Sequence, residues 1–355
     1  FYEIIFDPKV PDYAAVDSCV NLARKFANKK TIGFTNAVLR NLVREKNKDN
    51  DWYKELKYKS GWSSIPSWME KRWLVNFGEK NLFKLIEFIN QPPITFLRCD
   101  SVSISMEKKI RLLETEGIET QLFSNNFLMV KSNENKILSS RLFKNGDISI
   151  QSPSAAAIVD CLGIKKGDVV LDVCAAPGTK TLQLANLVGV DGFIYASDIS
   201  SERVFSGQED EKRHGRKNIH WSLKDARKDA YIKADKILID APCSGTGVMG
   251  RRPDIRWRRK ESDLGKFAHV QLSMINNCSK YLKKGGALVY ATCSIEPEEN
   301  LMVVEQFLNL NSNFVVDKIP NNVPKQWVKD KKALNIFPHK HGLDGIFAIR
   351  MKKIF

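Results

Sequence analysis

The sequence lacks any Cys-x-x-Cys pair, and its seven cysteines are an odd number in a chain of 355 residues. A disulfide scaffold and a zinc ribbon are therefore excluded, and we expect reduced thiols and no metal site. No uncharged apolar run reaches the roughly 18 residues that a membrane-spanning helix needs. An initiator methionine and a signal peptide are also missing before Phe1. We expect a cytoplasmic protein with no membrane partner and a truncated N-terminus.

The chain contains fewer acidic than basic residues. Asp and Glu number 41 against 56 Lys and Arg, which gives a formal net charge of +15. This excess favours a polyanionic partner, most often a nucleic acid, and a merely basic proteome is the alternative explanation. Hydrophobic residues make up 43% of the chain, which provides for substantial cores and excludes disorder as the main state.

The first 150 residues contain two kinds of pattern. Apolar residues at helical spacing predict a helix over residues 12–26, a second one after Gly33, and a third from Ser67. The breaker Gln91-Pro92-Pro93 ends this helical part. Beyond it, the pattern predicts a small α+β module with a helix at residues 106–116 and strands at 94–99, 118–123 and 127–130.

From residue 151 onward, strands and helices alternate. Short apolar runs of the kind found in parallel sheets lie at residues 169–173, 193–197, 236–239 and 287–291. Such alternation predicts a doubly wound α/β sheet, in which ligands bind at the carboxyl ends of the strands. The sequence therefore predicts a multidomain protein of the α plus α/β class.

A tight turn follows the first of these strands. The segment reads Asp172-Val173-Cys174-Ala175-Ala176-Pro177-Gly178-Thr179-Lys180, and we expect a helix from about Thr179. Backbone N–H groups at such a turn can face a ligand such as a nucleoside. An ordinary strand-to-helix turn is the alternative.

Two acidic residues follow at positions that suit a nucleoside. Asp198 comes directly after the next strand, where a carboxylate accepts hydrogen bonds from ribose hydroxyls, although it could equally cap the following helix. Asp225 is a weaker candidate for the adenine end, and by itself it reads as a plain loop residue.

Two cysteines lie at the ends of the later strands. Asp240-Ala241-Pro242-Cys243-Ser244-Gly245-Thr246-Gly247 ends the third strand, and Tyr290-Ala291-Thr292-Cys293-Ser294 ends the fourth. Buried cysteines usually behave as small hydrophobic residues, and we interpret Cys161 and Cys278 in that way. For Cys243 and Cys293, at the ligand-binding edge of the sheet, we prefer a chemical role.

A basic run follows the first cysteine block directly. It contains six basic residues and one tryptophan in ten positions, and a solvated charge run is the usual explanation of such a pattern. Beside a catalytic edge it favours phosphate contacts and base stacking. The candidate RNA-binding residues are Arg251, Arg252, Arg256, Trp257, Arg258 and Arg259.

The blocks at residues 174–178, 240–247 and 290–294, in this order, resemble the Nol1/Nop2/Sun RNA (cytosine-5) methyltransferases. Residues 10–16 and 33–41 look like the later helices of a NusB-like RNA-binding domain, a combination similar to the bacterial 16S rRNA branch of that family.

The resemblance covers essentially the whole chain, and residues 342–348 resemble the closing strand of the family fold. It implies a NusB-like helical domain at residues 1–60, a linker helix and small RNA-binding subdomain at 61–150, and a Rossmann-like methyltransferase domain at 151–355.

The resemblance also implies residue roles. Cys293 would be the nucleophile that adds to C6 of cytosine, Cys243 would serve product release, and Asp240 would contact the base. The cofactor S-adenosylmethionine (SAM) would be bound by Cys174, Ala175, Ala176, Pro177, Gly178, Thr179, Lys180, Asp198, Asp225 and Asp240. The family turn usually reads Pro-Gly-Gly-Lys, so we expect strain and weaker SAM binding if position 179 needs a positive φ.

The leading hypothesis is a monomeric SAM-dependent enzyme that methylates C5 of one cytidine in 16S rRNA. Because the cysteine blocks do not encode the target, tRNA is the nearest alternative substrate. A DNA cytosine methyltransferase shares the covalent chemistry. A non-catalytic RNA-binding or ribosome assembly factor that keeps the fold is an alternative of another class.

Overall fold

The structure, a computed structural model, describes residues 1–7, 9–48, 63–99 and 104–355. The chain divides into two compact units, residues 1–64 and residues 65–355. The predicted boundary near residue 60 falls within residues 49–62, outside the described part of the chain.

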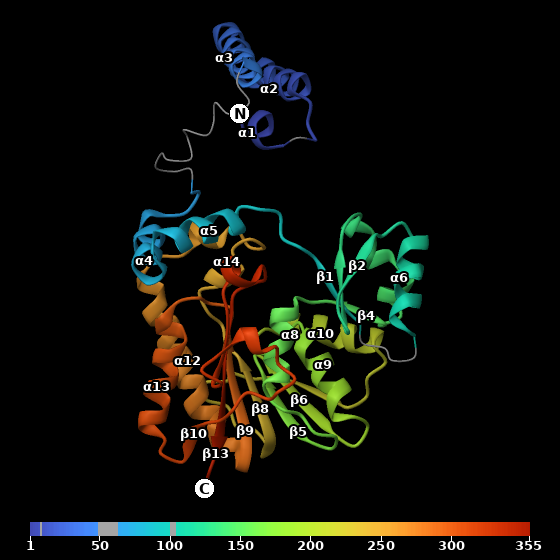
Figure 1. Cartoon of the computed structure of the whole chain (residues 1–355), viewed down its shortest axis with the longest axis vertical. Helices are drawn as coiled ribbons and strands as arrows, with labels where there is room; N and C mark the ends of the chain where they lie inside the picture. Colours follow the sequence, from blue (N-terminus) through green and yellow to red (C-terminus); the bar gives the residue numbers. More distant parts are fainter. Residues whose placement is uncertain (8, 49–62, 100–103) are drawn as a thin grey trace. The chain divides into compact units, whose positions relative to one another are not determined.

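The first unit is helical. It contains α1 (Tyr2–Phe6), α2 (Asp12–Phe26) and α3 (Lys29–Lys48) (Figure 1). The predicted extent of α2 is confirmed, whereas the predicted start of the next helix was wrong. The α3 helix begins before Gly33 because the side-chain oxygen of Asn28 caps it, accepting a hydrogen bond from the backbone N–H of Thr31 at 2.9 Å. The buried core of this unit consists of Ile4, Ala15, Val16, Val20, Leu39 and Leu42.

Two helices open the second unit. They are α4 (Ser67–Phe77) and α5 (Glu79–Ile89), and Gly78 with φ 76° joins them. Their apolar faces do not pack on the small α+β module. They form one buried cluster with residues of the α/β region, among them Met249, Ile255 and Ile295.

The small α+β module is an antiparallel four-stranded sheet in the order β2-β3-β1-β4. The strands predicted to start at residues 94 and 118 begin two residues later, at Phe96 and Thr120. Its elements are β1 (Phe96–Cys99), α6 (Met106–Thr115), β2 (Thr120–Ser124), β3 (Phe127–Val130), a 3-10 helix (Glu134–Ser139), α7 (Arg141–Lys144) and β4 (Ile148–Ile150).

The large sheet has the order β11-β12-β13-β9-β8-β5-β6-β7, and β10 also pairs with β13. Its strands are β5 (Val169–Val173), β6 (Phe193–Asp198), β7 (Ile219–Leu223), β8 (Ala234–Asp240), β9 (Leu282–Thr292), β10 (Phe314–Val316), β11 (Val328–Lys329), β12 (Ala333–Ile336) and β13 (Ile346–Lys353). The strands from β5 to β9 pair in parallel, as predicted, whereas β13 runs antiparallel to β9.

Helices cover both faces of this sheet (Figure 1). Alternate residues of β5 point to opposite faces, so Val170 packs with α8 and α9 while Leu171 and Val173 pack with α12 and α13. The helices are α8 (Pro153–Asp160), α9 (Thr179–Val188), α10 (Ser201–Arg213), α11 (Ile255–Arg258), α12 (Ser262–Cys278), α13 (Leu301–Leu310) and α14 (Pro338–His341). The class I Rossmann-like arrangement brings the ends of β5, β8 and β9 to one edge.

Candidate active site

An open cavity of about 790 Å³ lies at the carboxyl ends of β5, β6, β8 and β9. The turn after β5, the acidic residues and both cysteine blocks all contribute to its wall. The predicted catalytic and cofactor-binding residues that line it are Cys174, Ala175, Ala176, Pro177, Gly178, Thr179, Lys180, Asp198, Asp225, Asp240, Cys243 and Cys293. Segments far apart in the sequence therefore share one cavity.

The turn after β5 is held by backbone hydrogen bonds. The N–H of Ala175 donates to the carbonyl of Ser197 at 2.9 Å, and the N–H of Gly178 donates to the carbonyl of Ala175 at 2.9 Å. Gly178 adopts φ 105°, and a Cβ atom there would lie 3.0 Å from the ring of Trp221. Glycine is favoured at this position because the backbone conformation is unfavourable for an L side chain and an added Cβ atom would press on the Trp221 ring.

The expected strain at Thr179 is absent. Thr179 is the first residue of α9, and it is not among the described residues with a positive φ. The left-handed conformation falls instead on Gly178 and on Cys174, whose φ is 62°. The departure from the family turn is therefore accommodated, because the right-handed helix has already begun at this position.

Asp198 stabilises the turn from the neighbouring strand. It is buried; Oδ2 accepts a hydrogen bond from the N–H of Ala176 at 3.2 Å, and Oδ1 accepts one from the N–H of Ser200 at 3.1 Å. The N-cap residue of α10 is Ser200 and not Asp198, and the ribose contact of Asp198 stays a prediction. Asp225 is paired with Arg227 at 2.7 Å, and this hydrogen bond lowers the pKa of Asp225 to about 2.

Asp172 is a site residue that sequence reasoning missed as a candidate. Its Oδ2 accepts a hydrogen bond from the Thr181 hydroxyl at 2.6 Å, and its Oδ1 has no hydrogen-bond partner among the described residues. Burial raises the pKa of Asp172 to about 7, and the neighbouring carboxylates of Asp240 and Asp198 add to this. The only signal in the sequence is an acidic residue inside an apolar strand.

The sulfur atoms of the two cysteine blocks lie side by side at the cavity. The Sγ atoms of Cys243 and Cys293 lie 3.3 Å apart at the cavity. The hydrogen bond with Cys293 and then burial raise the pKa of Cys243 well above its usual value. Cys243 therefore keeps its proton at neutral pH. By contrast, Cys161 and Cys278 are fully buried in apolar clusters, as expected.

A lysine at the start of α9 reaches across to the carboxylate that precedes the first cysteine block. The Nζ of Lys180 donates to Oδ2 of Asp240 at 2.6 Å, and its charge also interacts with Cys293. Although burial lowers the pKa of Lys180, the charge of Asp240 raises it overall, so the ammonium form is favoured. The sequence did not reveal this positive charge beside the thiols.

The basic run is divided by the structure. Arg256 was expected to contact RNA, but its side chain is buried and donates to the carbonyl of Ile89 and to Oδ1 of Asn90, each at 2.6 Å. It joins α11 to the end of α5. Trp257 is 68% exposed, and neighbouring Arg258 is exposed too.

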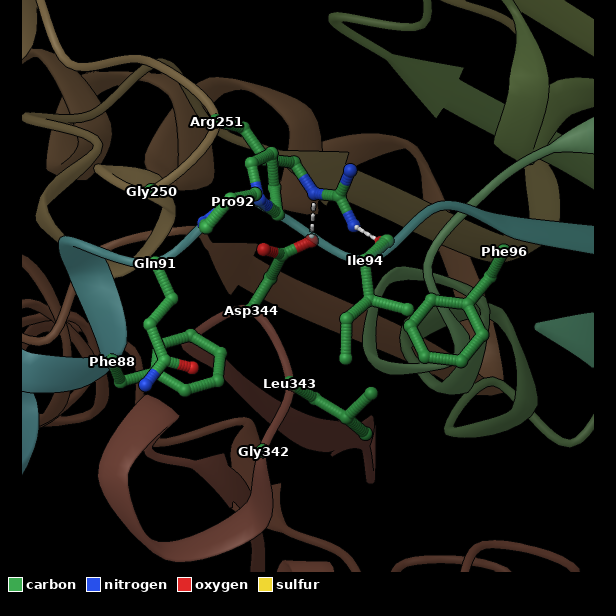
Figure 2. A pocket seen from close by; sticks show the side chains of 11 residues that line it. Phe88, Gln91, Pro92, Ile94, Phe96, Gly250, Arg251, Gly342, Leu343 and Asp344 are labelled. Carbon is green, nitrogen blue, oxygen red and sulfur yellow. Dashed lines mark hydrogen bonds and ion pairs between the residues drawn. The ribbon is translucent and has the colours of Figure 1, made fainter. Parts of the chain in front are cut away.

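Arg251 and Arg259 are held by partners, and Arg252 is exposed at the cavity wall. In Figure 2, Arg251 donates to Oδ2 of Asp344 at 2.7 Å and to the carbonyl of Ile94. Arg259 donates to the carbonyl of Ser244 at 3.0 Å. These contacts join the basic run to the segment before β1, to the segment before β13 and to the turn of the first cysteine block.

The described residues contain neither a membrane-spanning helix nor a cluster of metal ligands. No helix in the described ranges combines the length and the apolar character that a membrane crossing requires. In the same part of the chain, no group of three or more His, Cys, Asp or Glu residues is arranged to hold a metal ion.

Two family models match the chain. The model described as 16S rRNA methyltransferase RsmB/F matches residues 159–352, and the NusB family model matches residues 1–44. The chain is 32% identical to the probable ribosomal RNA small subunit methyltransferase B of Bacillus subtilis, over 99% of this chain and 80% of that protein.

Solved structures share the fold. A methyltransferase homologue from Pyrococcus horikoshii is 27% identical with a TM-score of 0.66, covering 82% of this chain and 96% of that one. NSun6 from Pyrococcus horikoshii, solved with SFG, is 23% identical with a TM-score of 0.73, covering 82% of this chain and 99% of that one. The chain therefore belongs to the RsmB/F family of 16S rRNA methyltransferases, as a SAM-dependent rRNA methyltransferase.

Proposed function

We propose that the protein methylates C5 of one cytidine in 16S rRNA through a covalent bond between Cys293 and C6 of the base. The observation that carries this proposal is the convergence of two thiols, 3.3 Å apart, on the cavity that the cofactor turn also lines. Neither thiol is needed to bind a nucleoside, whereas covalent catalysis at cytosine needs a sulfur nucleophile.

The residues at the turn fit SAM. Gly178 and the rest of the turn line the cavity, whose volume of about 790 Å³ has room for both a cofactor and a base. Asp198 and Asp225 are acidic groups on the wall that suit the hydroxyls and amino group of a nucleoside. When bound, SAM supplies an electrophilic methyl group.

The roles of the thiols follow from their surroundings. Cys243 keeps its proton because its pKa is raised, so we assign the attack on the base to Cys293, whose sulfur lies 3.3 Å away at the same cavity. Addition of the Cys293 thiolate to C6 makes C5 nucleophilic, so that it accepts the methyl group. The C5 proton then leaves to solvent, its bonding electron pair restores the C5–C6 double bond, and the C6–S bond breaks to free the product and the Cys293 thiolate. We assign this release stage to Cys243.

Asp240 is placed to contact the base. Its carboxylate lines the cavity and is held by Lys180, so the pair presents one acceptor and one donor where the cytosine ring must lie. The base has to leave its stack to reach the thiol, which favours a flipped nucleotide in a loop. Arg252, Trp257 and Arg258 are the exposed members of the basic run that we propose contact the RNA.

The test is a methyl-transfer assay. Wild-type protein, Cys293→Ala and Cys243→Ala are incubated with methyl-labelled SAM and unmodified 16S rRNA, tRNA or DNA, and RNA–protein adducts are resolved on denaturing gels. Cys161→Ala, which removes a buried sulfur of the hydrophobic core, is the matched control. We expect label in 16S rRNA, at least about a 1,000-fold loss in Cys293→Ala, and a trapped adduct in Cys243→Ala.

Other outcomes have definite meanings. Label confined to tRNA would leave the chemistry standing and refute the 16S target, and label in DNA would refute the RNA assignment. Bound SAM without label in any nucleic acid would favour the assembly-factor alternative. A Cys293→Ala protein as active as the Cys161→Ala control would refute the covalent mechanism.

A further inference from the structure

A buried glutamate lies behind the two cysteine turns. Glu299 ends the 3-10 helix Pro297–Glu299, which follows the second cysteine block, and its side chain is fully buried. The assigned roles of the site do not use it. A buried carboxylate is retained only with hydrogen-bond partners, so its contacts indicate what it does.

The Glu299 carboxylate contacts the residue that follows each cysteine. Ser244, next to Cys243, donates its backbone N–H to Oε1 at 2.8 Å and its hydroxyl to Oε2. Ser294, next to Cys293, donates its hydroxyl to Oε2 at 2.6 Å. One carboxylate therefore joins two turns that are 50 residues apart in the sequence.

A second layer holds Glu299 itself. Nε2 of Gln271, on α12, donates to Oε1 of Glu299 at 3.2 Å and to the carbonyl of Pro242 at 2.9 Å. The Tyr290 hydroxyl donates to the backbone carbonyl of Glu299. The carboxylate is thus fixed from the helix and from β9, and it has little freedom to follow a movement of either turn.

The two turns also contact each other directly, and the hydroxyl oxygens of Ser244 and Ser294 lie 3.1 Å apart. The N–H of Gly247 donates to the carbonyl of Cys293 at 2.9 Å, and the N–H of Ile295 donates to the Thr246 hydroxyl at 3.1 Å. Both serine hydroxyls donate to the same carboxylate oxygen, Oε2 of Glu299, so the carboxylate holds this pair of serines together beside the thiols.

We propose that Glu299 is a positioning residue that keeps the Cys243 and Cys293 sulfur atoms together at the cavity. The inference rests on the proposed function, in which the two thiols act on the same base. It goes further in assigning their relative placement to a residue that contacts neither the base nor SAM. Burial raises the pKa of Glu299, and the donated hydrogen bonds oppose that rise.

The experiment measures how close together the Cys243 and Cys293 sulfur atoms lie, and it does not depend on catalysis. Phenylarsine oxide reacts with two adjacent thiols: two As–S bonds form, the As–O bond breaks, and the oxygen leaves with both thiol protons as water. Bridging needs both sulfur atoms close together, whereas iodoacetamide alkylates each thiol singly. The variants are Glu299→Ala, Glu299→Asp and Glu299→Gln, with exposed Glu305→Gln as the matched control. Thermal melting reports whether each variant folds.

We expect Glu299→Ala to bridge about 10-fold more slowly, because the second thiol loses its effective concentration, while single alkylation persists. Methyl transfer should fall about 100-fold in kcat with the KM for SAM unchanged. Glu299→Asp keeps the charge but is one methylene too short to reach both serines, and should bridge slowly too. Glu299→Gln keeps an acceptor for the Ser244 N–H and can donate to the serine hydroxyls, so it should restore both rates.

Folded Glu299→Ala or Glu299→Asp protein that bridges at the wild-type rate would overturn the inference. So would unfolding of both, or a Glu299→Gln protein that folds and bridges as slowly as Glu299→Ala, because Glu299 would then act in folding or through charge alone. Failure of the proposed function is separate: it appears as methyl transfer by Cys293→Ala, whatever the arsenical shows.

Discussion

The two sides of the active-site cavity are built differently. The cofactor side comes from one short stretch, in which β5, the turn at residues 174–178 and the start of α9 follow one another directly. The cysteine side is assembled from residues 240–247, 290–299 and 342–345, which backbone and carboxylate contacts bring together. One side is therefore fixed by local geometry, and the other by long-range packing.

This difference predicts how each side fails. A change in the turn alters one ligand contact and leaves the sheet standing, because the turn is a single strand-to-helix connection, although Ala175 also donates to Ser197 on β6. A change where the distant segments of the cysteine side contact one another disturbs both thiols at once. Substitutions on the two sides can therefore be compared directly, with the loss of stability and of activity as readouts.

The largest effect is expected from Gly247→Ala on the cysteine side. A Cβ atom at Gly247 would overlap the carbonyl oxygen of Gly345 and lie 2.9 Å from that of Cys293. Because both neighbours are backbone, we expect the free energy of unfolding to fall by about 3 kcal/mol and thiol bridging to slow. Denaturant unfolding measures the first effect and phenylarsine oxide the second.

Gly265→Ala is the control for that change. Gly265 lies inside α12, and no heavy atom lies within 4 Å of an added Cβ. Alanine there should be neutral or stabilise by about 0.5 kcal/mol, since it is the better helix former. Equal stability of the Gly247→Ala and Gly265→Ala proteins would show that the backbone around Gly247 is not tightly packed.

The next effect concerns the charge of Asp172 on the cofactor side. The folded protein holds this proton up to about pH 7, whereas the unfolded chain loses it near the ordinary value of 3.8. The stability contribution is therefore present at acid pH and is lost as the pH rises through the folded pKa. Asp172→Asn should remove a slope of at most about 1.4 kcal/mol per pH unit between these values.

Urea unfolding of Asp172→Asn and wild type from pH 4 to pH 8 measures this difference, with exposed Asp191→Asn as the control. Some slope should remain in the variant, because burial also raises the pKa of Asp160 to about 6. Parallel curves for the wild type and Asp172→Asn would mean that Asp172 ionises in the folded state as readily as in the unfolded chain.

The smallest effect on stability is expected from Gly178→Ala. Its φ of 105° is unfavourable for alanine, and the added Cβ would press on the Trp221 ring, which is a movable side chain. We expect a loss of about 1 kcal/mol in stability and a roughly 10-fold weaker SAM affinity by calorimetry. Thiol bridging should stay at the wild-type rate; slower bridging would show that the two sides are not independent.

Prediction from the sequence succeeded where a signal was local. The α2 helix, the strand Val169–Val173 and the helix start at Thr179 follow from apolar spacing and a glycine turn, and the structure has them at the predicted residues. It failed where the environment of a residue depends on a partner that is distant in the sequence. Arg256 belongs to a basic run in the sequence, yet a backbone carbonyl and an asparagine at the end of α5 hold it inside the protein.

By itself, the sequence determined the alternation of strands and helices, the glycine turn and the two cysteine blocks, because each depends on residues within a few positions of one another. Only the tertiary structure decided that the sulfur atoms of Cys243 and Cys293 meet at 3.3 Å, that Lys180 reaches Asp240, and that Glu299 joins the two turns. Those contacts depend on which strands become neighbours in the sheet, and that order is set by packing over the whole domain.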